Sequence, residues 1–94
     1  MTYNEIKDFL RGYGVYERAD GFKVAVELIN LALVTKEKKV NKLVKHLAEQ
    51  RGRSVSTINN ELRYAITLKN IYGGNLTVKE LVKLALHKQE ERGL

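Results

Sequence analysis

The sequence predicts a single all-α domain, a small bundle of five or six helices that contains a helix-turn-helix. Its 94 residues are enough for one hydrophobic core and too few for two. Proline is absent, and helix-forming residues such as Leu, Ala, Glu, Lys and Arg are abundant. Apolar residues recur at helical spacing, and the one Asp-Gly pair, Asp20-Gly21, precedes a helical pattern instead of joining two strands.

The first two helices are predicted over 2–12 and about 21–34. The first opens with a capping box, in which Thr2 and Glu5 satisfy each other's free backbone N–H groups. Asp20 is the expected N-cap of the second helix. That second helix is apolar almost all round, which is typical of the buried centre of a small bundle. The apolar face of the first helix consists of Tyr3, Ile6, Phe9 and Leu10.

Three further helices are predicted over about 40–51, 55–71 and 78–91. The last begins at a second capping box, formed by Thr77 and Glu80. The third and fourth are amphipathic, because apolar residues follow one face of each. These stripes are Val40, Leu43, Val44, Leu47 and Ala48 in the third helix, and Val55, Ile58, Leu62, Ala65 and Ile66 in the fourth.

The junction of the third and fourth helices has the layout of a helix-turn-helix. Ala48 is small enough for the fourth helix to cross close to it, and Gly52 tolerates the positive φ of a sharp turn. Ser54 is placed to cap the fourth helix, and Ile58 to fill the angle between the two helices. An ordinary helical hairpin is the alternative, because Arg53 stands where the usual pattern has an apolar residue.

Positive charge is concentrated on this helix-turn-helix, which spans about 40–71. The chain carries 17 basic and 11 acidic residues, a net charge of +6. Residues 40–73 alone hold six basic against two acidic residues, which gives +4. Such a face favours a polyanion. The predicted phosphate-binding residues are Lys39, Lys42, Lys45, Arg51, Arg53 and Lys69.

The outward face of the fourth helix favours contact with base edges in the major groove. It carries short hydrogen-bonding side chains and one arginine, whereas a merely solvated face, the alternative interpretation, would more often alternate Glu and Lys. Arginine pairs with guanine and asparagine with adenine. The sequence therefore predicts a small transcriptional regulator that binds double-stranded DNA sequence-specifically. The predicted base-reading residues are Ser56, Thr57, Asn59, Asn60 and Arg63.

These features resemble the C-terminal DNA-binding effector domain of the stage-zero sporulation response regulator of spore-forming Firmicutes. The resemblance runs from Gly21 to Asn70, and the last helix is similar in pattern over 77–86. The matching residues are Gly21-Phe22, Leu47-Ala48, Ser54, Ser56, Ile58, Arg63, Ala65 and Ile66.

The resemblance implies an α domain that reads the major groove with its fourth helix and docks copies in tandem on repeated sites. By position it assigns the DNA-facing role to the five base-reading residues named above. Thr57, Asn59 and Asn60 stand where the family carries charged residues, so a different target sequence is expected. The 94 residues hold no receiver domain, so phosphorylation control is not implied, and a phage or mobile-element origin is expected.

The sequence predicts no enzyme, no metal and no cofactor. Cysteine is absent, and His46 and His87 lack the partners of a convincing metal site. No nucleophile, base and orienting group can be assembled. No apolar run is long enough to span a bilayer, and residues 2–10 are too polar for a secretory signal. A cytoplasmic, nucleoid-associated protein is expected.

Two further predictions concern protein partners. Because one helix-turn-helix reads only a few base pairs, we expect a homodimer or tandem assembly through Leu81, Leu84 and Leu86 of the last helix. The alternative function is a protein-interaction or inhibitor module that directs the same scaffold at a host protein. Its support is that Leu84 and Leu86 fall outside the main apolar stripe of the last helix and could form an exposed patch; the other interpretation is that they complete the bundle or a homodimer.

Overall fold

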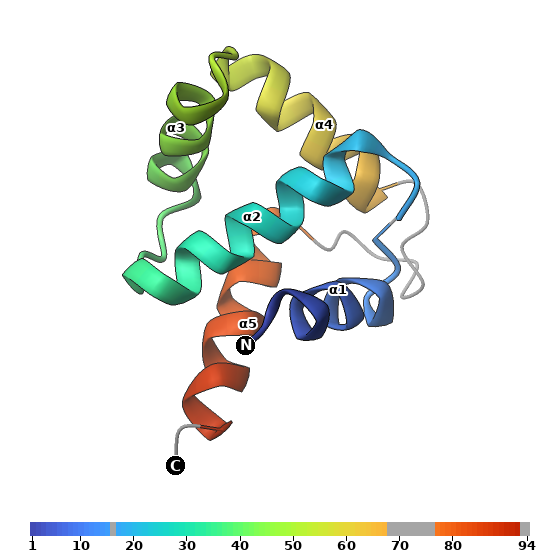
Figure 1. The fold of residues 1–94 in the computed structure, drawn as a ribbon, viewed down its shortest axis with the longest axis vertical. Helices are drawn as coiled ribbons and strands as arrows, with labels where there is room; N and C mark the ends of the chain where they lie inside the picture. Colours follow the sequence, from blue (N-terminus) through green and yellow to red (C-terminus); the bar gives the residue numbers. More distant parts are fainter. Residues whose placement is uncertain (16, 68–76, 93–94) are drawn as a thin grey trace.

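The computed structural model describes residues 1–15, 17–67 and 77–92 and confirms the all-α prediction. Its described part contains five α-helices and no strand (Figure 1). The helices are α1 (Tyr3–Gly12), α2 (Asp20–Thr35), α3 (Val40–Arg51), α4 (Val55–Thr67) and α5 (Val78–Arg92). The predicted continuation of the fourth helix over 68–71 lies outside the described residues.

Helix α2 is the centre of the fold, as its composition predicts. It contacts each of the other four helices. Figure 1 shows it crossing the middle of the molecule, with α3 and α4 above it and α1 and α5 below in this view. Its exposed residues lie towards its two ends, with Asp20 and Lys23 near the start and Val34, which is 73% exposed, near the finish. The position of α4 is therefore set by packing against a helix that every other element also contacts.

The start of α2 differs from the prediction. The N-cap is Ala19, and its side chain makes no capping hydrogen bond. Asp20 is instead the first residue of the helix, where its negative charge faces the positive end of the helix dipole. Gly21 is therefore the second residue of α2, in the first turn, which packs on α4.

Two aromatic or apolar residues predicted to be buried are exposed. Tyr3 is 54% exposed, and its hydroxyl accepts a hydrogen bond of 3.4 Å from Asn30 Nδ2. Val55 is 43% exposed because it is the first residue of α4, ahead of the turn that contacts the core. None of the polar or charged residues in the described chain is buried as a whole, so its buried residues are apolar or glycine.

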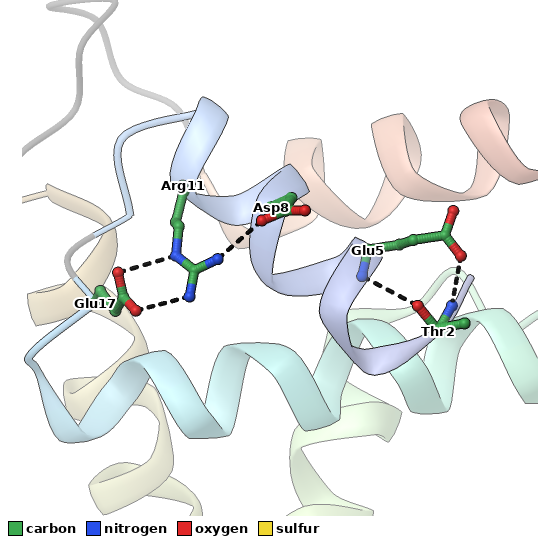
Figure 2. A network of polar contacts seen from close by, with 5 residues as sticks. All are labelled: Thr2, Glu5, Asp8, Arg11 and Glu17. Carbon is green, nitrogen blue, oxygen red and sulfur yellow. Dashed lines mark hydrogen bonds and ion pairs between the residues drawn. The ribbon is translucent and has the colours of Figure 1, made fainter.

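Polar contacts fix α1 at both ends (Figure 2). At its N-terminus the predicted capping box is present, with the Glu5 N–H donating to Thr2 Oγ1 and the Thr2 N–H donating to Glu5 Oε1. Near its C-terminus the Arg11 guanidinium bridges Asp8 and Glu17 at 2.8 and 2.7 Å. Arg11 lowers the pKa of Glu17, and Glu17 raises that of Arg11.

The Glu5 carboxylate also joins the two ends of the described chain. The hydrogen bond from the Thr2 backbone, followed by one from the Arg92 guanidinium at the end of α5, lowers the pKa of Glu5 from 4.5 to about 2. Because the folded pKa is depressed, Glu5 stabilises the fold above pH 4.5. That stabilisation is lost as the pH falls from 4.5 towards 2.

We therefore expect the Glu5 carboxyl to titrate near pH 2 in an NMR titration of its side-chain chemical shift. The Arg92→Gln variant should move this midpoint upwards, towards 4.5, because it removes one of the two donors. A wild-type midpoint already at 4.5 would mean that the cap and the contact with Arg92 are not formed in solution.

Candidate nucleic-acid interface

The turn between α3 and α4 has the geometry that its sequence predicts. Gly52 is left-handed, with φ 63° and ψ 34°, and ends α3. The Arg53 N–H donates to the Ala48 carbonyl at 3.0 Å, which satisfies a carbonyl in the last turn of α3. Ser54 Oγ accepts the Thr57 N–H at 3.1 Å and caps α4.

Apolar contacts fix the angle of α4. Ile58 is fully buried and Ala48 is 5% exposed, so the interior of the turn is filled as predicted. On its other side α4 meets the first turn of α2. A Cβ added to Gly21 would lie 1.9 Å from the Glu61 carbonyl oxygen, so the two backbones approach as closely as glycine permits.

The exposed face of α4 contains three of the five predicted base-reading residues. Ser56, Asn60 and Arg63 are exposed and lie four and three residues apart, which places them along one side of the helix. Asn59 is half-buried at the edge of this face. Tyr64, at the other edge, is 56% exposed. We refer to Ser56, Asn60 and Arg63 as the α4 stripe.

Thr57, another of the predicted base-reading residues, also takes part in the cap of α4. It is half-buried, and its hydroxyl lies 2.8 Å from the Ser54 hydroxyl. Since its N–H also donates to Ser54, Thr57 is part of the cap that starts α4. Its hydroxyl is therefore engaged with the cap residue Ser54.

The two arginines at the turn are paired with carboxylates, which the sequence did not predict. Arg51 lies 2.8 Å from Glu27 of α2, and Arg53 lies 2.5 Å from Glu61 of α4. Glu61 Oε2 is buried and has no hydrogen-bond partner among the described atoms. These ion pairs connect the turn to α2 and α4. They also partly neutralise the charge of both guanidinium groups, which leaves less of it for a phosphate.

The predicted phosphate-binding lysines are more available. Lys39 and Lys45 are exposed, and neither forms an ion pair with any described residue. Lys42 lies 3.6 Å from Glu37, with 67% of its side chain exposed. Lys69 lies outside the described residues.

Two basic residues that sequence reasoning missed join this surface. Lys79 and Lys83 of α5 line a groove of about 510 Å³ against the start of α3. Their spacing of four residues was a visible signal that both lie on one face of α5. The sequence does not show which helix this face of α5 packs against, because that depends on tertiary packing. We call this feature the lysine groove; its lining residues are Lys38, Lys39, Val40, Asn41, Lys42, Lys79 and Lys83.

The exposed apolar patch predicted on the last helix is absent from α5. Leu81 and Leu86 are 1% and 8% exposed and belong to the core, and Leu84 is half-buried against it. The leucines instead complete the bundle, the other interpretation, because α5 packs on α2, α3 and α4 and buries more than one apolar stripe. Two of the three leucines expected to mediate self-association are thus already covered within one chain.

Neither metal-binding nor membrane-spanning features occur in the residues that the structure describes. No three His, Cys, Asp or Glu side chains come together there as a possible metal site. His46 and His87 are exposed, and His87 Nε2 lies 2.9 Å from Glu91. None of the described helices is long and apolar enough to cross a bilayer.

Comparison with known protein families, curated proteins and solved structures finds no significant match for this chain. The likeness to the sporulation effector domain therefore stays a prediction from the residues that carry it.

Proposed function

We propose that the protein binds double-stranded DNA sequence-specifically, with α4 in the major groove, and acts as a small transcriptional regulator. The observation that carries this proposal is the α4 stripe. It presents an amide, a hydroxyl and a guanidinium from a helix whose start and angle are fixed by the turn at Gly52. These groups match the donors and acceptors of base edges in a groove wide enough for a helix.

The distribution of charge supports the same proposal. Lys45 lies on α3 and Lys39 lies just before it. In a helix-turn-helix the first of the two helices, here α3, crosses the DNA backbone. With a net charge of +6, the chain attracts a polyanion before specific contacts form. The alternative, a protein-interaction module, loses its sequence support because Leu86 is buried.

Binding to duplex DNA over a salt series tests the proposal. The logarithm of the binding constant should fall linearly with the logarithm of the salt concentration, with a slope of about −0.9 for each phosphate neutralised. Selection of bound duplexes from a random pool should then yield a preferred site. Absence of duplex binding at low salt would overturn the proposal.

Replacing Arg63 by alanine should weaken binding to the preferred site by about 1–3 kcal/mol and relax the preference at one base position. The matched control is Lys45→Ala, which also removes one exposed positive charge but should weaken binding to all sequences alike. Competition assays with the selected site and a scrambled duplex measure both effects. Equal losses on both duplexes for Arg63→Ala would make Arg63 a phosphate contact only.

A further inference from the structure

We propose that the lysine groove binds the phosphate backbone of the same duplex that α4 reads. The inference rests on the proposed function and extends it to α5, which contributes Lys79 and Lys83 to the DNA-binding surface. Under this proposal the DNA contacts two separate parts of the protein. The α4 stripe contacts bases, and the lysine groove contacts phosphates beyond them.

The groove is built from two elements that are distant in the sequence. Lys38 and Lys39 precede α3 and lie close to its first turn, whereas Lys79 and Lys83 occupy one face of α5. Val40, the first residue of α3, is half-buried between them. The four lysine side chains are exposed, so their amino groups are accessible from solvent.

The charge of the groove distinguishes it from the turn. Its lining includes five lysines and no acidic residue. Of these lysines only Lys42 forms an ion pair with a described residue, to Glu37 at 3.6 Å. Both arginines of the turn, by contrast, are paired with carboxylates at 2.8 Å or less. The strongest uncompensated positive charge near α3 is therefore at its start.

The position of the groove suits a DNA backbone. Helix α3 has 12 residues, so its start lies about 18 Å from the turn that leads into α4. In a helix-turn-helix complex the first helix crosses the backbone while the second enters a major groove about 12 Å wide. Phosphates that border the major groove of the DNA therefore come within reach of side chains at the start of α3.

The spread of the five amino groups also favours a line of phosphates over one small anion. They extend over two helices and a connecting segment, and the lining contains no buried polar group that would fix a single ion in place. Separate, exposed ammonium groups instead match a backbone in which each strand carries a charge about every 3.4 Å along the duplex axis.

The decisive experiment compares Lys79→Gln/Lys83→Gln with the control Lys7→Gln/Lys23→Gln, which removes the same charge from α1 and α2. The groove variant should lose about two units from the salt-dependence slope and bind all duplexes about tenfold or more weakly at 0.1 M salt. Its preference for the selected site over a scrambled duplex should not change. The Lys79→Arg/Lys83→Arg variant should restore wild-type binding, because the charge is retained.

Each other outcome has a definite meaning. If wild-type protein binds duplex DNA and the groove variant has the slope of the control, the inference is wrong while the proposed function stands. If wild-type protein binds no duplex, both fail. Saturable binding of inorganic phosphate at Lys79 and Lys83, seen by NMR without a change in the DNA slope, would also overturn the inference. Thermal unfolding of each variant excludes a loss of fold.

Discussion

Replacing Gly21 by alanine should lower the free energy of unfolding by about 3 kcal/mol. The added Cβ would lie 1.9 Å from the Glu61 carbonyl oxygen and 3.1 Å from the Ala65 Cβ. The first of these neighbours is backbone inside α4, so it cannot rotate away as a flexible side chain can. Helices α2 and α4 must move apart, which opens their shared interface. Urea unfolding of the purified variant measures the loss.

The matched control for this substitution is Gly12→Ala. Gly12 also lies in a helix, but a Cβ there would meet nothing within 4 Å. Alanine should be neutral or stabilise α1 by up to about 1 kcal/mol, through its higher helix propensity. If the Gly21 and Gly12 variants unfolded at the same urea concentration, α2 and α4 would have to lie further apart in solution.

A chain that ends at Asn75, and so lacks α5, should be unfolded. Leu81, Val82 and Leu86 are almost fully buried in the common core. Removing these three side chains would forfeit about 1.5–3 kcal/mol each, a sum comparable with the entire stability of a small domain. Circular dichroism should show loss of most helical signal, and the proposed binding to DNA should be lost with the fold.

Point variants give the matched control for this truncation. Leu81→Ala should destabilise the full chain by about 2–5 kcal/mol. Leu84→Ala should cost clearly less, because Leu84 is only half-buried. A shortened protein that kept its fold but lost cooperative binding to tandem DNA sites would contradict this account. It would identify α5 as the surface for self-association instead.

Local signals explain which parts of the fold were predictable. The capping box at Thr2, the glycine stop at Gly52 and the cap at Ser54 each act within four residues, and all three are present. The central helix was also predictable, because a helix that is apolar on most sides has no face suited to water. The buried face of α4 followed from helical period, apart from Val55 at its exposed first turn.

The site was harder to predict because its electrostatics depend on contacts between distant residues. Glu27 neutralises Arg51 across 24 positions of sequence. Lys79 and Lys83 reach the start of α3 only because α5 folds back onto it. Thr57 makes a local contact that helical period alone does not reveal. Helical period places it near the outward face, but its hydroxyl is engaged with the cap residue Ser54.

The central place of α2 has a consequence for how binding at α4 can be detected. Since α2 contacts all the other helices, α4 has no separate stability, and a ligand bound to α4 stabilises the whole domain. Free ligand at 100 times its Kd would add about 2.7 kcal/mol to the free energy of unfolding by mass action. For a domain of this size that raises the Tm by about 10 °C or more. A spectroscopic probe beside α1, such as the ring of Tyr13, would therefore detect binding at α4 as a rise in the Tm.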